Sequence, residues 1–115
     1  MFNFFNRKAD RSELPPADVQ QRQAAGEQLF ILDVREPAEY AEAHIAGSTL
    51  IPLGQLANRI SKLPQDRPIV AVCRSGNRSS VALSVLTRAG FTNVLNLRGG
   101  MLAWARSGLP VKRGK

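Results

Sequence analysis

The stretch that decides the fold is Ile69-Val70-Ala71-Val72-Cys73-Arg74-Ser75-Gly76-Asn77-Arg78. Its four leading apolar residues are mostly β-branched, which is typical of a strand buried on both faces of a parallel sheet. A short loop with one glycine follows, and apolar residues at helical spacing over residues 79–89 then predict a helix. The stretch therefore indicates an α/β fold, and it places the only cysteine of the chain directly after a strand.

Strands and helices alternate on both sides of this stretch. Short apolar runs predict further strands over residues 29–32, 49–51 and 94–97. Prolines at helix starts, glycines at helix ends and helical spacing predict helices over residues 16–25, 37–42, 53–63 and 99–104. This alternation predicts right-handed crossovers and hence a small parallel sheet with helices on both faces.

The length of 115 residues suits one domain with one hydrophobic core. We predict that residues 14–111 form this domain, with a polar N-terminal extension over residues 1–13 and a basic C-terminal tail over residues 112–115. No apolar run approaches the roughly 20 residues that cross a bilayer, and the N-terminus lacks the features of a secretory signal. Cytoplasmic residence is the expectation, and a single cysteine agrees with a reducing compartment.

Positive charge is concentrated in the second half of the chain. Residues 1–65 hold seven Lys or Arg and eight Asp or Glu, a net charge of −1, whereas residues 66–115 hold nine and one, a net charge of +8. The basic residues stand singly, few aromatic residues lie among them and no nucleic-acid-binding motif occurs, which argues against DNA or RNA as a partner. We therefore expect small anionic substrates near Cys73.

The loop after Cys73 is suited to holding an anion. Backbone N–H groups of a short loop with a glycine can turn inward, and a helix N-terminus adds free donors and partial positive charge. Such surroundings favour the thiolate of Cys73, which is the nucleophilic form of the side chain, and Arg74 and Arg78 act in the same direction. The same donors would hold the outer sulfur of a persulfide anion.

Three motifs, in this order and spacing, resemble those of the rhodanese family, and the resemblance covers residues 29–111. The first motif is Leu32-Asp33-Val34-Arg35-Glu36-Pro37, with Glu39-Tyr40 and His44-Ile45-Ala46-Gly47 after it. The second is the Cys73 loop with Ser79-Ser80, and the third is Leu97-Arg98-Gly99-Gly100 with Ala103-Trp104 and Gly108-Leu109-Pro110-Val111. The family commonly has Gly before the His-Ile pair and Pro after it, where this chain has Ala43 and Ala46.

The resemblance implies a rhodanese-like α/β domain that acts as a thiosulfate sulfurtransferase. Sulfane sulfur would pass from thiosulfate or a similar anionic donor to cyanide or a thiol acceptor, through a persulfide on Cys73 as catalytic residue. Arg74 is a candidate contact for the sulfonate end of the donor. The substrate-binding loop of the family corresponds here to Arg74, Ser75, Gly76, Asn77 and Arg78.

Other residues near the loop are expected to support it rather than to react. Asp33 and Arg35 suit a structural ion pair or a loop brace, and Ser79 is assigned to structural support as well. His44, the only histidine, is also expected to be structural, because attack by a thiolate needs no base. One Cys and one His offer no metal-ligand cluster, and the mechanism requires neither a metal nor an organic cofactor.

Two other functions fit parts of the sequence. A cysteine-dependent phosphatase also uses a Cys and an Arg at a helix N-terminus, but such phosphatases resemble Cys, five residues, Arg, whereas four residues separate Cys73 from Arg78. A thiol-redox arsenate reductase would usually use a resolving cysteine, which this chain lacks. A rhodanese-like binding module without turnover would be expected to lose the nucleophile or break the loop, yet both Cys73 and Gly76 are present.

Overall fold

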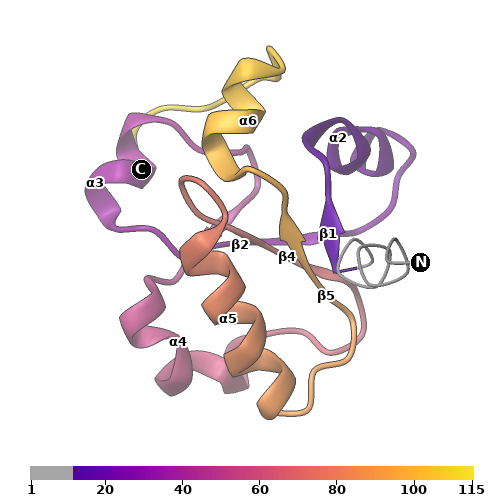
Figure 1. The fold of residues 1–115 in the computed structure, drawn as a ribbon, viewed down its shortest axis with the longest axis vertical. Helices are drawn as coiled ribbons and strands as arrows, with labels where there is room; N and C mark the ends of the chain where they lie inside the picture. The colour runs from indigo at the N-terminus through magenta and orange to yellow at the C-terminus, as the bar shows by residue number, and fades with distance from the viewer. Residues whose placement is uncertain (1–11) are drawn as a thin grey trace, which may run out of the picture.

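A five-stranded parallel sheet runs through the structure, a computed structural model that describes residues 12–115 (Figure 1). The strands are β1 (Glu13–Leu14), β2 (Phe30–Asp33), β3 (Thr49–Leu50), β4 (Ile69–Val72) and β5 (Val94–Leu97). They lie in the order β1-β5-β4-β2-β3, so that β4 is central, and every neighbouring pair is parallel. Parallel neighbours need crossover connections, and the predicted α/β fold class is confirmed.

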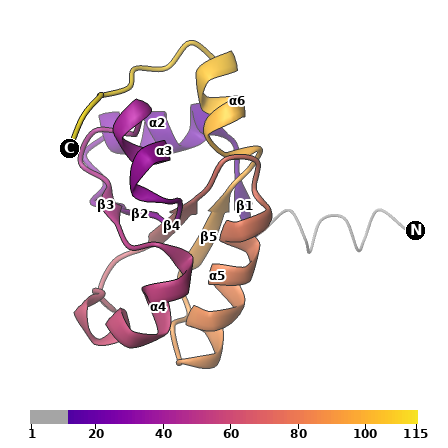
Figure 2. The same cartoon turned by 90° about the vertical axis from the view of Figure 1, so that its left-hand side faces the viewer.

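Helices cover both faces of this sheet (Figure 2). They are α2 (Pro16–Ala24), α3 (Pro37–Glu42), α4 (Leu53–Arg59), α5 (Asn77–Arg88) and α6 (Gly100–Arg106). Residues of α4 and α5 share one hydrophobic cluster with the sheet, and residues of α2 and α6 share the other. The sheet is therefore the middle layer of three, as the alternation of elements predicted.

The central strand β4 is buried along its whole length. Ala71 faces the hydrophobic cluster that contains Leu86 of α5, whereas Val70 and Val72 face the cluster that contains Trp104 of α6. Successive side chains of a strand point to opposite faces, and both faces of this sheet are covered. This two-sided burial explains why β4 is a continuous apolar run rather than an alternating one.

The elements differ from the predicted bounds in a few places. β1 was not predicted, because a strand of two residues shows no periodicity in the sequence. It is defined by its pairing with β5: the N–H of Asn96 donates to the carbonyl of Ser12 (2.7 Å), and the N–H of Arg98 donates to the carbonyl of Leu14 (3.0 Å). α5 begins at Asn77 rather than at residue 79, since Gly76 at a φ of 110° turns the loop directly into the helix. The helix expected over residues 53–63 ends at Arg59 and continues as a 3₁₀ turn.

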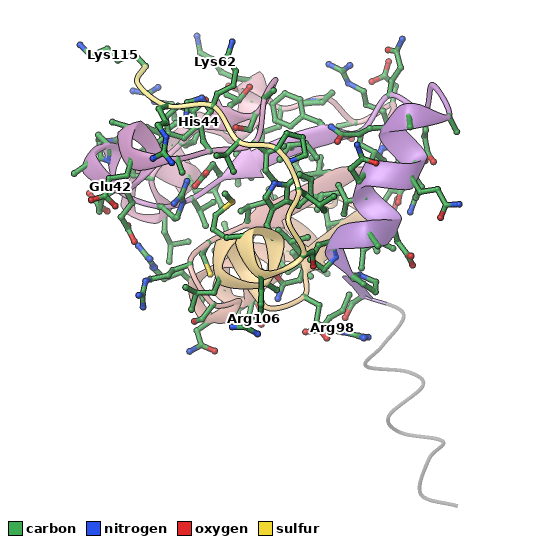
Figure 3. All side chains as sticks on the ribbon, turned by 90° about the horizontal axis from the view of Figure 1, so that it is seen from above. Glu42, His44, Lys62, Arg98, Arg106 and Lys115 are labelled. Carbon is green, nitrogen blue, oxygen red and sulfur yellow. The ribbon has the colours of Figure 1, made fainter. Side chains whose placement is uncertain are left out.

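The C-terminal segment runs from α6 to the turn that follows α3 (Figure 3). Lys112 and His44 exchange two backbone hydrogen bonds of 2.9 and 2.8 Å. The N–H of Gly114 donates to a carbonyl of α3 (2.7 Å), and Nη1 of Arg113 donates to the carbonyl of Glu42 (2.9 Å). The residues predicted to be a basic tail therefore lie against α3.

The predicted N-terminal extension lies outside the described residues up to residue 11, and Glu13 belongs to β1. Within residues 12–115, no helix is long and apolar enough to cross a membrane.

Candidate active site

Cys73 follows the central strand of the sheet and begins the loop that leads into α5. Cys73 is only 1% exposed. Its sulfur accepts a hydrogen bond from the backbone N–H of Gly76 (Sγ to N, 3.0 Å) and lies 3.3 Å from the Ser79 hydroxyl oxygen. The loop thus turns back on the sulfur and directs a backbone N–H group at it.

The electrostatic surroundings of Cys73 favour the thiolate. Burial alone would raise the pKa of the thiol, because it removes water from the charged form. Hydrogen bonds from the Ser79 hydroxyl and from the backbone N–H groups of Ser79, Gly76 and Ser75 outweigh burial, so the pKa of Cys73 lies below its ordinary value. A lowered pKa increases the nucleophilic fraction of the side chain near neutral pH.

The start of α6 holds the backbone of the loop from the other side. The N–H of Met101 donates to the carbonyl of Cys73 (2.9 Å), and the N–H of Leu102 donates to the carbonyl of Arg74 (3.0 Å). Gly100 makes this approach possible, because a Cβ there would lie 2.5 Å from the Arg74 carbonyl oxygen. The Cys73 and Arg74 carbonyls are therefore directed to α6. The Gly99-Gly100 motif at the start of this helix thus holds the Cys73 loop in place.

A buried polar network connects the loop to β5. The hydroxyl of Ser79 donates to Oδ1 of Asn96 (2.5 Å), and Nδ2 of Asn96 donates to the carbonyl of Gly76 (3.1 Å). Both side chains are almost fully buried. Asn96 was not among the residues predicted for the site, although an amide within the otherwise apolar strand Val94–Leu97 is a signal that could have identified it.

Arg78 lies in the first turn of α5, and its guanidinium group forms an ion pair with Glu39 of α3. Nη1 is 2.8 Å from Oε1 and Nη2 is 2.8 Å from Oε2, a bidentate geometry. The hydrogen bonds of Arg78 lower the pKa of Glu39 to about 2. Glu39 belongs to the first of the three sequence motifs, but its spacing in the sequence predicts no role for it.

Asp33 and Arg35 form a buried ion pair at the end of β2. Nε of Arg35 donates to Oδ1 of Asp33 (2.9 Å), and Nη2 donates to Oδ2 (2.8 Å) and to the carbonyl of Ala43 (2.7 Å). This pair ties the strand end to the turn that contains His44. The imidazole of His44 is stacked on Tyr40, with its Nδ1 2.7 Å from the Tyr40 carbonyl oxygen.

The remaining loop residues face solvent. Arg74, Ser75 and Asn77 are exposed, and within residues 12–115 the guanidinium group of Arg74 has no ion pair or side-chain hydrogen bond. The same described part of the chain contains no group of three or more His, Cys, Asp or Glu that could hold a metal ion. The arrangement brings one buried thiol, directed N–H donors and one unpaired exposed cation to a single loop.

Comparison with known proteins places these features in a family context. The sequence model of the rhodanese-like domain family matches residues 15–107. A sulfurtransferase of Allochromatium vinosum is 42% identical over 100 residues, which cover 87% of this chain and 94% of that protein. A putative sulfurtransferase of Bacillus subtilis is 37% identical over 80% of this chain and 88% of its own length.

Solved structures agree with these relatives. The crystal structure of a rhodanese-related protein from Thermoplasma volcanium superposes with a TM-score of 0.80 at 33% sequence identity. The match covers 87% of this chain and 96% of that protein.

Proposed function

Because the chain belongs to the rhodanese family of sulfurtransferases, we propose that it transfers a sulfane sulfur from thiosulfate or a similar donor to cyanide or a thiol, through a persulfide on Cys73. The observation that carries this proposal is the set of hydrogen-bond donors directed at the Cys73 sulfur. These donors favour a thiolate, and the same groups suit the anionic persulfide that would follow it.

The first half of the reaction loads the enzyme. The Cys73 thiolate attacks the sulfane sulfur of the donor, a new S–S bond forms, and the S–S bond inside the donor breaks with its electron pair leaving on the sulfonate part. With thiosulfate, the products are the Cys73 persulfide anion and sulfite, so charge and atoms balance without a proton or an external reductant. The step is nucleophilic covalent catalysis.

The second half discharges the enzyme. Cyanide or a thiolate attacks the outer sulfur of the persulfide, and the Cys73 thiolate leaves with the electron pair of the S–S bond. The products are thiocyanate or a small persulfide. The Cys73 thiolate is the nucleophile of the first half and the leaving group of the second. The N–H groups around Cys73 therefore stabilise the negative charge on its sulfur in both halves.

Donor binding is assigned to the exposed side of the loop. Arg74 is exposed and unpaired within the described residues, which suits a contact with the sulfonate end of a donor. Ser75, Gly76, Asn77 and Arg78 complete the proposed substrate-binding loop, with Gly76 contributing its backbone N–H. Asp33, Arg35 and Ser79 support it.

Intact-mass measurement after treatment with thiosulfate and removal of the excess donor tests the proposal. The chain has one cysteine, so the mass should rise by one sulfur atom and no more. Addition of cyanide should remove this mass and release an equivalent amount of thiocyanate. Cys73→Ser should stay folded and show no addition, because a serine hydroxyl remains protonated near neutral pH.

A native protein that gains no sulfur from thiosulfate or from other sulfane donors would contradict the proposal. Hydrolysis of an aryl phosphate through Cys73, under conditions where no sulfur is loaded, would favour the phosphatase alternative instead.

A further inference from the structure

The two arginines of the Cys73 loop are in different electrostatic states. Arg74 has no ionic partner within residues 12–115. Both terminal nitrogens of Arg78 are occupied by the Glu39 carboxylate, each at 2.8 Å. A bidentate pair of this kind holds the guanidinium in one orientation and offsets its positive charge.

Glu39 is itself held in place, so the pair is a built feature rather than a chance contact of two surface side chains. Its Oε1 accepts a hydrogen bond from the backbone N–H of Glu36 (2.9 Å) in the capping box that begins α3. The side chains of Arg78 and Glu39 are 36% and 29% exposed. Because the pKa of Glu39 is about 2, its charge is present throughout the neutral range.

The pair also lies beside the reacting sulfur, because Arg78 directly precedes Ser79, whose hydroxyl oxygen is 3.3 Å from Sγ of Cys73. The pKa of Arg78 is raised, chiefly by its hydrogen bonds to Glu39 and, to a smaller extent, by the negative charge of Cys73. A guanidinium group that interacts electrostatically with the thiolate also interacts with an anionic donor that approaches the thiolate. The charge of Glu39 therefore acts on the donor site through Arg78.

We propose that Glu39 is a specificity-determining residue: by offsetting the charge of Arg78, it reduces the electrostatic advantage of the doubly charged thiosulfate over singly charged sulfane donors such as thiosulfonates. This inference rests on the proposed function. Arg74 and Arg78 would present two positive charges to a donor, but Glu39 reduces their sum to one. The interaction of a donor with this sum scales with the donor's own charge, so a dianion loses more than a monoanion.

The test compares two donors in the native chain and in Glu39→Gln. Glutamine keeps the acceptor for the Glu36 N–H but removes the charge and frees Arg78. We expect kcat/KM for thiosulfate to rise about fivefold to thirtyfold, and that for the singly charged benzenethiosulfonate to rise only about twofold to fivefold. The decisive measurement is the ratio of the two kcat/KM values, since a general structural change would alter kcat/KM for both donors by the same factor.

Two further variants serve as controls. Glu42→Gln makes the same change of charge at the end of the same helix, at an exposed residue whose carboxylate has no partner within residues 12–115. It should leave the donor ratio unchanged. The double variant Glu39→Gln/Arg78→Gln should lose the gain for thiosulfate, because the gain requires the freed guanidinium group.

The outcomes separate this inference from the proposed function. If the native chain loads sulfur but Glu39→Gln keeps the native donor ratio, or if the gain survives without Arg78, the role of Glu39 is wrong and the sulfurtransferase proposal stands. If the native chain loads sulfur from neither donor, both fail. Thermal unfolding of each variant verifies that the proteins compared are folded.

Discussion

The Ser79 hydroxyl has one proton and two neighbours that can accept it. Asn96 directs its NH₂ group at the Gly76 carbonyl, so its oxygen faces Ser79 and can only accept. While Cys73 is a thiol, its S–H can donate to Ser79, and Ser79 can donate to Asn96. Once Cys73 is a thiolate, its sulfur can only accept, and the Ser79 proton then stabilises it best by turning toward the sulfur.

Removal of this hydroxyl should therefore raise the pKa of Cys73. In Ser79→Ala the burial of the thiol remains, while the hydrogen bond that opposes burial most strongly is lost. The rate of alkylation by iodoacetamide follows the thiolate fraction, so the midpoint of its pH profile should move to higher pH. Ser80→Ala is the matched control, since Ser80 is the next residue of α5 and is exposed. An unchanged midpoint in Ser79→Ala would assign the thiolate stabilisation to the backbone N–H groups alone.

Between elements, α3 and α5 are joined by the Glu39–Arg78 ion pair. The pKa of Glu39 is about 2 in the folded chain, against an ordinary value of 4.5. A carboxyl group with a lower pKa in the folded state stabilises the fold above its ordinary value, and this contribution disappears as the pH falls from 4.5 to about 2. The ion pair between α3 and α5 should therefore stabilise the fold less as the pH falls below 4.5.

Denaturant unfolding at a series of pH values measures this contribution. The free energy of unfolding of the native chain should fall more steeply between pH 4.5 and about 2 than that of Glu39→Gln, which has no proton to bind at this position. Above this window, the native chain should be the more stable of the two. Parallel curves for the two proteins would show that the ion pair contributes nothing to folding.

The contact between α6 and the Cys73 loop depends on one glycine. Gly100 has a φ of 59°, and a Cβ there would overlap the carbonyl oxygens of Cys73 and Arg74. Gly108 also has a positive φ, of 73°, but a Cβ there would meet no atom within 4 Å. Substitution of either glycine by alanine would strain the backbone, but only substitution of Gly100 would also cause steric overlap.

Gly100→Ala should lower the free energy of unfolding by about 1–3 kcal/mol more than Gly108→Ala, because overlap adds to the strain that both changes cause. It should also slow sulfur loading, since the displaced carbonyls belong to the loop that holds the nucleophile. Denaturant unfolding and intact-mass loading measure the two effects. Equal stabilities of the two variants would mean that the loop and α6 separate at little cost.

Over the whole molecule, the C-terminal segment connects the last helix to the turn after α3. Four hydrogen bonds of Lys112, Arg113 and Gly114 hold it there. They contact α3 and His44 rather than the Cys73 loop. The segment therefore belongs to the fold but not to the proposed chemistry.

A chain that ends at Val111 should lose about 1–3 kcal/mol of unfolding free energy, the amount expected from a few hydrogen bonds. Its loading of one sulfur on Cys73 should persist. A chain that ends at Gly114 keeps all four bonds and is the control. If the shorter chain is as stable as the native one, residues 112–115 are a tail in the sense that the sequence predicted.

The order of strands and helices could be predicted from the sequence because it depends on local patterns. The apolar run of β4, the stripe of α5 and the glycines at helix ends each act over a few residues, and they indicate the same layered fold. Cys73 could be predicted as the candidate nucleophile for the same reason, since its loop lies between a recognisable strand and a recognisable helix. Helix ends and the two-residue β1 were less well predicted, because tertiary hydrogen bonds decide them.

Only the tertiary structure decided which side chains meet around Cys73. Glu39 and Arg78 are 39 residues apart, and Ser79 and Asn96 are 17 apart, so no local spacing links either pair. The sequence placed Arg78 in the loop with Arg74 as a similar cation, but packing of α3 beside α5 gives one arginine a carboxylate and leaves the other without one within the described residues. Local sequence determines elements through backbone periodicity, whereas the pairing of charges and amides follows from how those elements pack, and packing is a property of the whole chain.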